Sequence, residues 1–150
     1  MTYPLFSDEY FMNEALKEAQ KATEKDEVPV GAVIVANNTI IARSHNLTVK
    51  LNDVTAHAEM QAITSAEYYL GSRYLNECVL YVTLEPCLMC AAATSWAQIG
   101  KIVYGADDPK AGYSRLGKKV LHPKTVVVKG IMQNECGDIL SKFFMKKRDL

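Results

Sequence analysis

The fold follows from one stretch of the chain, residues 78–98, which reads CVLYVTLEPCLMCAAATSWAQ. Its first part, Cys78–Leu84, is an apolar run with β-branched and aromatic residues, the pattern of a buried strand. Pro86 suits the first position of a helix, and apolar or small residues then continue to about Gln98. The stretch therefore predicts a buried strand that passes almost directly into a helix.

Helices and strands alternate on both sides of this stretch, after an opening hairpin that turns at Asn37-Asn38. Apolar residues recur at helical or strand spacing in each segment. This order predicts an α/β fold in which a mixed sheet has helices on both faces. The expected elements are a helix capped by Ser7, a hairpin of residues 31–36 and 40–42, a helix over 55–70, strands over 102–104 and 126–128, and a last helix over 131–147.

The length and composition are those of one domain. The chain has 150 residues, of which 49% are hydrophobic, so we expect a single domain over residues 1–150. No apolar stretch reaches the length of a membrane span, and no basic run near the start suggests a secretory signal. Four cysteines in such a chain are typical of the reducing cytoplasm, where they more often bind metals or take part in catalysis than form disulfides.

Net charge is zero overall but differs between the two parts of the chain. Residues 1–100 carry 6 Lys and Arg against 12 Asp and Glu, a net charge of −6, whereas residues 101–150 carry 11 against 5, a net charge of +6. A basic segment can meet a polyanion, but it also suits the solvated face of a polar helix. Charge alone favours the solvated helix.

Two short motifs carry candidate metal ligands. One is His57-Ala58-Glu59 and the other is Pro86-Cys87-Leu88-Met89-Cys90. Cys87 and Cys90 are three residues apart, so they share one side of a helix and can hold one ion. A helix N-terminus also stabilises the thiolate form that zinc requires. With His57 as the third ligand, one tetrahedral position stays open, which is typical of a catalytic zinc site.

Glu59 follows His57 by two residues and therefore points in a different direction from that ligand. A carboxylate there is expected to move protons between water and substrate. The cysteine pair alone would also fit a redox pair, half of a zinc ribbon or a zinc-stabilised binding module. The combined pattern, H-x-E followed by P-C-x-x-C, is the signature of zinc deaminases that act on cytosine or adenine. Since a structural site needs no proton shuttle, Glu59 favours the enzyme.

The remaining cysteines and histidines have no place in this pattern. Cys78 and Cys136 lie in apolar runs and are expected to be buried core thiols. His45 and His122 lack the spacing of metal ligands.

A longer resemblance runs from about Phe11 to Arg148. The chain resembles the bacterial tRNA-specific adenosine deaminases, which make inosine at the wobble position of the anticodon. The stretches that carry the resemblance are Glu27–Val33, Thr55–Glu59, Leu84–Ala91, Val103–Gly112, Gly130-Ile131, Glu135-Cys136 and Phe143-Phe144.

This resemblance implies a fold, an assembly and a set of site residues. The fold is a cytidine-deaminase-like three-layer α/β/α arrangement with a five-stranded mixed sheet. The implied protein is a cytoplasmic homodimer with one Zn²⁺ per subunit, acting on the tRNA anticodon loop, with the basic residues 146–148 near the RNA. Glu59 is the implied catalytic residue beside the ligands His57, Cys87 and Cys90. The residues implied to contact the substrate are Val30, Asn46, Asp107, Asp108, Lys110 and Phe144.

Three departures from that family bear on the choice of substrate. The family usually has Gly at the position of Ala92 and Arg at that of Gln98, and the segment of residues 113–121 is shorter than usual. Residues 52–59 and 69–71 look as much like bacterial guanine deaminases, whereas the C-terminal third does not. A salvage deaminase of a free base or nucleoside, such as guanine or cytosine, therefore stays open as an alternative.

Overall fold

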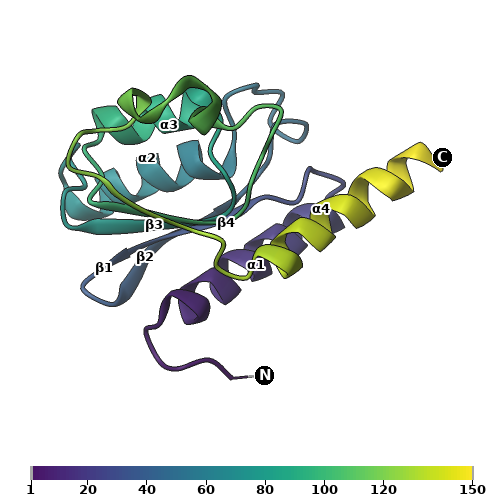
Figure 1. The fold of residues 1–150 in the computed structure, drawn as a ribbon, viewed down its shortest axis with the longest axis horizontal. Coiled ribbons are helices and arrows are strands. Elements are labelled where there is room, and N and C mark those ends of the chain that lie inside the picture. Colours follow the sequence, from purple (N-terminus) through teal and green to yellow (C-terminus); the bar gives the residue numbers. More distant parts are fainter. Residues whose placement is uncertain (1, 150) are drawn as a thin grey trace.

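The computed structural model describes residues 2–149 and contains one five-stranded sheet with four α-helices (Figure 1). Two short 3₁₀ turns, at Tyr113–Leu116 and Lys118–Val120, lie between the last two strands. The helices and strands are α1 (Asp8–Glu24), β1 (Gly31–Ala36), β2 (Thr39–His45), α2 (Ala58–Leu70), β3 (Cys78–Leu84), α3 (Leu88–Trp96), β4 (Lys101–Ala106), β5 (Val126–Lys129) and α4 (Gln133–Arg148).

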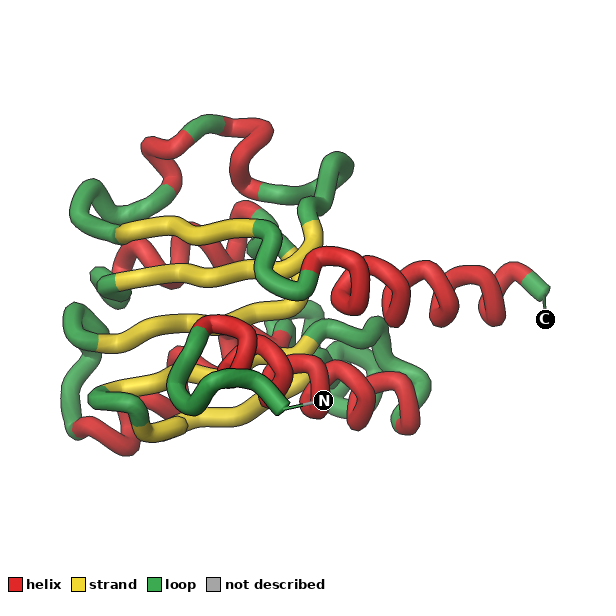
Figure 2. The backbone as a smooth tube through the Cα atoms, turned by 60° about the horizontal axis from the view of Figure 1, so that its bottom comes forward, coloured by secondary structure: helices red, strands yellow, loops and turns green. Residues whose placement is uncertain are grey.

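The order of the strands brings four chain segments to one edge of the sheet. The strands lie in the order β2-β1-β3-β4-β5 (Figure 2). β1 pairs antiparallel with both β2 and β3, and β4 and β5 run parallel to β3. The carboxyl ends of β2, β3 and β4 therefore meet at the edge where β1 begins. The loops that follow these three strands are thus neighbours in space.

The sheet separates two helical layers, as the sequence predicts. In Figure 1, α2 and α3 cover one face of the sheet, and α1 and α4 lie against the other. Two hydrophobic clusters match these layers, one under α2 and α3 and one under α1 and the start of α4. The predicted three-layer α/β/α fold with a mixed five-stranded sheet is confirmed. No helix within residues 2–149 has the length and apolar character needed to cross a bilayer.

The last helix is attached to the body mainly by its first turns. Cys136 is its one fully buried residue among those that the structure describes, and its sulfur occupies the space that a Cβ on Gly105 of β4 would fill. From there α4 extends beyond the sheet (Figure 2), and near its far end Lys147 forms an ion pair with Asp26 in the turn after α1. This end carries Lys146, Lys147 and Arg148.

The predicted elements are confirmed, but three helices begin two or three residues later than expected, including α4, which starts at Gln133 instead of Ile131. The other two bear on the site. The helix predicted over 55–70 starts at Ala58, because Asp53 accepts hydrogen bonds from the backbone N–H and the hydroxyl of Thr55 and holds that segment in a turn. Pro86 is not the first residue of α3, since Cys87 is the N-cap and the helix begins at Leu88. In both cases the shift turns a candidate metal ligand into the residue that precedes the helix.

Close contact between α1 and β1 depends on one glycine. A Cβ built on Gly31 would lie 2.0 Å from the carbonyl oxygen of Ala15 and 2.4 Å from the backbone nitrogen of Ala19. Both atoms are helix backbone, so they cannot move aside as a flexible side chain would. Gly31 therefore sets the distance at which α1 packs on the sheet.

We predict that Gly31→Ala lowers the free energy of unfolding by about 3 kcal/mol, because the added methyl forces α1 off the sheet. Urea unfolding followed by circular dichroism measures the change. The matched control is Gly137→Ala in α4, where an added Cβ meets nothing within 4 Å. That control should gain up to about 1 kcal/mol, since Ala is the better helix former. Equal stability of the two variants would contradict the prediction.

Candidate metal centre

The candidate centre lies where the N-termini of α2 and α3 meet. His57 is the N-cap of α2 and Cys87 is the N-cap of α3, yet neither side chain makes a capping hydrogen bond to its own helix. Cys90 lies in the first turn of α3 and is fully buried. The three side chains turn toward one another, so the structure brings together the residues that the sequence singles out.

The spacing of the three donor atoms fits a tetrahedral zinc ion. The Nδ1 atom of His57 is 3.6 Å from the sulfur of Cys87 and 3.4 Å from that of Cys90, and the three donor atoms lie within 4.8 Å of one another. Zinc bonds of about 2.3 Å to sulfur and about 2.0 Å to nitrogen, at tetrahedral angles, separate such donors by about 3.5 Å. Two thiols and one imidazole are also the donor types that zinc prefers. The cluster fits one Zn²⁺ ion.

The surroundings favour a thiolate at Cys87. A hydrogen bond with Cys90 and the neighbouring His57 lower the pKa of Cys87 to about 4, against the opposing effect of burial. The same hydrogen bond, together with burial, raises the pKa of the Cys90 thiol. The pKa of His57 is raised by its hydrogen bond with Cys87. One thiol is therefore ready to bind a cation without first losing a proton at neutral pH.

Glu59 lies beside the cluster in a nearly water-free position. Its side chain is 4% exposed, and burial raises the pKa of the carboxyl to about 7. A carboxyl with such a pKa can both take up and release a proton near neutral pH, which is the property of a general acid–base group. The structure thus places a buried carboxyl with a pKa near neutrality next to the three candidate metal ligands.

A cavity of about 270 Å³ opens onto these residues at the sheet edge where the strands end. Its walls come from the segment before β1, the loop after β2, the start of α2, and the segments after β3 and β4. The lining residues are Val28, Val30, Asn46, Thr48, His57, Ala58, Glu59, Leu84, Glu85, Cys87, Asp108 and Ala111.

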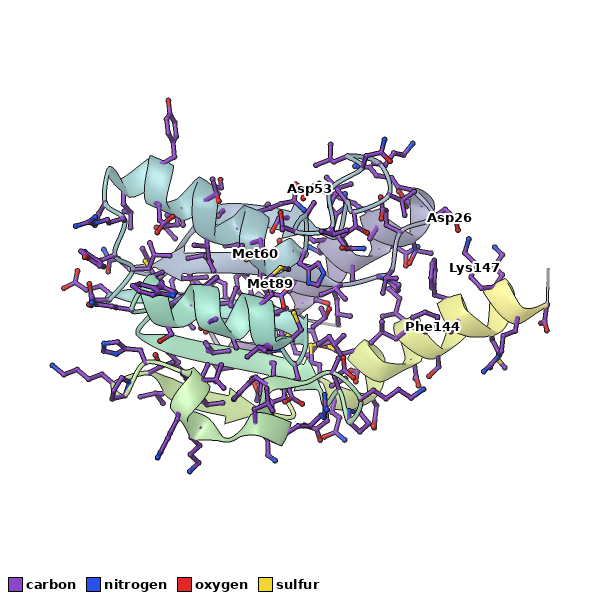
Figure 3. All side chains as sticks on the ribbon, turned by 90° about the horizontal axis from the view of Figure 1, so that it is seen from above. Asp26, Asp53, Met60, Met89, Phe144 and Lys147 are labelled. Atoms are coloured by element: carbon purple, nitrogen blue, oxygen red, sulfur yellow. The ribbon has the colours of Figure 1, made fainter. Side chains whose placement is uncertain are left out.

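The residues expected to contact a substrate lie at three different places. Val30, Asn46 and Asp108 line the cavity. Asp107 and Lys110 belong to the same loop as Asp108 but are not among the lining residues. Phe144 lies on α4, where 47% of its surface is exposed (Figure 3).

Two buried carboxylates near the cavity are not singled out by the sequence. Glu85 is 3% exposed and accepts hydrogen bonds from the backbone N–H groups of Asp108 and Ser114, both at 3.0 Å. Burial alone would raise its pKa, but these hydrogen bonds outweigh burial and lower it. Glu27 is fully buried and directly precedes Val28, which lines the cavity. Both residues belong to stretches that carry the family resemblance, Glu27–Val33 and Leu84–Ala91. Only the fold shows that each carboxylate accepts hydrogen bonds from the backbone of a loop.

Comparison with known proteins agrees with this geometry. The family model described as "Cytidine and deoxycytidylate deaminase zinc-binding region" matches residues 6–106. A protein of Bacillus subtilis (strain 168) named tRNA-specific adenosine deaminase is 48% identical over 146 residues, which cover 94% of this chain and 91% of that relative. A solved structure from work on "A-to-I Editing by tRNA:A34 Deaminases at the Wobble Position of Transfer RNA" is 47% identical with a TM-score of 0.82, covering 87% of this chain and 99% of that one.

One solved structure of a second kind of protein covers less of the chain. The structure of a guanine deaminase from Bacillus subtilis is 39% identical with a TM-score of 0.65, and the match covers 67% of this chain and 65% of that one. The partial likeness to guanine deaminases that the sequence indicates is therefore also seen when the structures are compared.

We predict that the purified protein holds about one zinc ion per chain and that Cys87→Ala removes most of it, because two remaining ligands bind zinc weakly. Elemental analysis after dialysis against a chelator measures the content. The matched control is Cys78→Ala, a buried cysteine of β3 outside the cluster, which should keep its zinc. Full zinc content in the Cys87 variant would rule out the assigned ligand set.

Proposed function

The chain belongs to the cytidine and deoxycytidylate deaminase family, and on that basis we propose that it hydrolyses adenosine to inosine at the wobble position of a tRNA anticodon. The observation that carries this proposal is the joint presence of the His57, Cys87 and Cys90 cluster and the buried Glu59 at one cavity. The adenosine substrate is supported by relatives with that name that match this chain over nearly its full length.

The proposed chemistry replaces the exocyclic amine of adenosine with the oxygen of water and releases ammonia. His57, Cys87 and Cys90 would hold the zinc ion and leave one position for water, whose pKa the bound ion would lower to near neutrality. Glu59 lies where it can accept a proton from the attacking water. It passes this first proton to the ring nitrogen, then takes the second proton from the hydroxyl group now bonded to the ring carbon and gives it to the departing amine, which leaves as ammonia, so that Glu59 ends each cycle in its starting state.

The walls of the cavity suit a base that has left its stack. Val28, Val30 and Leu84 offer apolar surface, whereas Asn46 offers a donor and an acceptor to a ring edge. A base in a single-stranded loop enters such a cavity at the lowest cost, since no base pair is broken. An anticodon loop meets this condition.

The far end of α4 supplies a basic surface for the proposed RNA partner. Lys146, Lys147 and Arg148 form its last turn, and Phe144 is half exposed beside them. The Nζ atom of Lys147 lies 2.6 Å from a carboxylate oxygen of Asp26, which ties this end of α4 to the turn after α1 (Figure 3). Cationic side chains on a protruding helix attract phosphates. A tRNA substrate also implies that the enzyme works in the cytoplasm.

The second candidate function is the deamination of free guanine. It is favoured by the likeness of residues 52–59 to guanine deaminases and by the solved guanine deaminase that matches 67% of the chain. It explains the cavity and the cluster equally well. It offers no reason for the basic end of α4, because a free base carries no phosphate.

We predict that the zinc-loaded enzyme forms inosine in an anticodon stem-loop with a wobble adenosine and releases no ammonia from free guanine, adenine or cytosine. Glu59→Gln should keep its zinc and lose roughly 10²-fold or more in turnover, as expected for a general acid–base residue. Glu67→Gln, on the half-exposed side of the same helix, is the matched control and should remain active. Rapid ammonia release from guanine without inosine in the stem-loop would replace this proposal with a salvage function.

We further propose that two chains associate through the outer face of α2 and α3. Met60 lies on α2 and Met89 lies on α3, and these two neighbouring helices form one helical layer (Figure 3). Tyr68 at the end of α2 is 90% exposed and Trp96 at the end of α3 is 84% exposed. Aromatic residues and methionine are enriched in the buried centre of protein interfaces. A second copy packed on this self-complementary face would bury them.

The assembly is tested by light scattering, which should give twice the chain mass of 16.7 kDa. Trp96→Lys places a charge in the proposed interface and should yield the monomer mass. Met145→Lys is the matched control, since Met145 is an exposed apolar residue on α4, away from this face. A monomeric wild-type protein at micromolar concentration would contradict the dimer.

A further inference from the structure

Glu85 is a buried carboxylate that directly follows β3, two residues before Cys87, and it lines the cavity. It forms part of no ion pair among residues 2–149. A buried carboxylate is costly unless hydrogen bonds replace its water. Its hydrogen-bond donors come from the segment after β4, which also supplies part of the cavity wall through Asp108 and Ala111.

Each oxygen of the Glu85 carboxylate holds one end of the loop of residues 108–114. Oε1 accepts a hydrogen bond from the backbone N–H of Asp108, and Oε2 accepts one from the backbone N–H of Ser114, both at 3.0 Å. One side chain therefore closes this loop across its base. Because the strands lie in the order β2-β1-β3-β4, the loop after β4 lies on one side of the cavity and the loop after β2 on the other.

The loop of residues 108–114 also has internal hydrogen bonds, which keep its shape without Glu85. Oδ1 of Asp108 accepts from the backbone N–H groups of Lys110 and Ala111, at 3.2 and 3.1 Å. The carbonyl oxygen of Asp108 accepts from the backbone N–H of Gly112 at 2.8 Å. The loop is thus a preformed turn, and the contact with Glu85 decides where that turn lies.

Gly112 leaves open the space that the carboxylate needs. A Cβ built on Gly112 would lie 2.3 Å from both Cδ and Oε2 of Glu85. The φ angle of Gly112 is −63°, which any residue can adopt, so glycine is required here for space and not for backbone freedom. The next N–H, that of Tyr113, donates to the carbonyl oxygen of Pro86 at 2.9 Å and ties this end of the loop to the residue before Cys87. Glu85 adds the other end of the loop to the same segment.

We propose that Glu85 is a positioning residue for the reaction: it clamps the loop of residues 108–114 to the segment that carries Cys87, and so fixes the distance between this wall of the cavity and the metal centre. The inference rests on the proposed deaminase function and deepens it. Glu85 acts through the loop, and the missing side chain of Gly112 is the second part of the clamp. A base that is held at one distance from the attacking water reacts faster than a base that shifts between positions.

The first test is Glu85→Gln, which keeps the shape of the side chain. An amide has one acceptor oxygen and one NH₂ donor, so in either orientation it turns a donor toward one of the two backbone N–H groups and loses that hydrogen bond. Hydrogen exchange followed by NMR measures the loss without a catalytic assay. The amides of Asp108 and Ser114 should be protected in the wild type, and at least one of them should exchange ~10-fold faster or more in the variant.

The same variant should lower kcat on the anticodon stem-loop by roughly 10-fold to 100-fold, the size of effect seen when a positioning group is lost. KM should change little, because contacts outside the cavity dominate RNA binding. Zinc content should equal that of the wild type, since Glu85 is not one of the three candidate ligands. The matched control is Glu77→Gln, an exposed carboxylate just before the other end of β3, which should change neither exchange nor turnover. All rates are measured well below the melting temperature of each variant.

The deciding test combines Glu85→Gln with Gly112→Ala. The added methyl displaces the carboxylate, so Gly112→Ala alone should also speed exchange at Asp108 and Ser114 and lower kcat. Because both changes break one clamp, the double variant should lose at most about 3-fold more kcat than the worse single variant, which is non-additivity of the kind that contacting residues show.

The outcomes separate this inference from the proposed function. Unprotected amides at Asp108 and Ser114 in the wild type, or unchanged exchange in Glu85→Gln, would show that there is no clamp. Faster exchange with an unchanged kcat, or losses that multiply in the double variant, would also overturn the positioning role. If the wild type forms no inosine, the proposed function fails, and the exchange rates still decide whether the clamp exists. If Glu85→Gln does not fold, Gly112→Ala alone must show both the faster exchange and the lower kcat, or the inference is wrong.

Discussion

Three donor atoms from two helix N-termini must converge within 4.8 Å, and the rest of the structure depends on this requirement. His57 and Cys87 are 30 residues apart in the chain, and a complete strand lies between them. Because β1 runs antiparallel to both of its neighbours, β2 and β3 end at the same edge of the sheet, where the helices that follow them begin. The sheet therefore builds the metal centre by fixing where two helices start.

The same edge gathers three buried glutamates that do different things. Burial raises the pKa of Glu59 to about 7, against the opposing effect of a hydrogen bond from its own backbone N–H, and this pKa suits proton transfer. Glu85 accepts hydrogen bonds from two backbone N–H groups of the segment after β4, and these hydrogen bonds lower its pKa. Glu27 accepts hydrogen bonds from two backbone N–H groups of the loop after β2. The same residue type is thus a candidate acid–base group at one position and a loop anchor at two others, according to the donors around it.

Local patterns in the sequence were sufficient to predict the helices and strands and to identify the candidate metal ligands. The apolar run of Cys78–Leu84 is a strand with those same bounds, and Ser7 caps α1 by accepting a hydrogen bond from the Tyr10 N–H. The pairing of H-x-E with P-C-x-x-C identified His57, Cys87 and Cys90 because the chemistry of zinc demands those residue types at short spacing. The strand, the cap and each of the two motifs can be recognised from residues that are close together in the sequence.

Other features depend on contacts between distant segments, which a single sequence does not reveal. The start of α2 shifts to Ala58 because Asp53 holds the preceding residues in a turn. The anchoring roles of Glu27 and Glu85 require backbone N–H groups that lie more than 20 residues further along the chain. Asn46 was identified through resemblance alone, and only the structure shows that its amide nitrogen donates a hydrogen bond to Glu27. The order of the strands in the sheet decides which distant segments become hydrogen-bond partners of these side chains.

The central claim is that this centre is a catalytic zinc site with three protein ligands and one open position beside Glu59. X-ray absorption spectroscopy of the purified, metal-replete protein tests it most directly. We expect two sulfur neighbours at about 2.3 Å and two nitrogen or oxygen neighbours at about 2.0 Å, one of the latter exchangeable with added anions. A zinc ion with three or four sulfur neighbours, or with four protein ligands and no exchangeable position, would contradict the account.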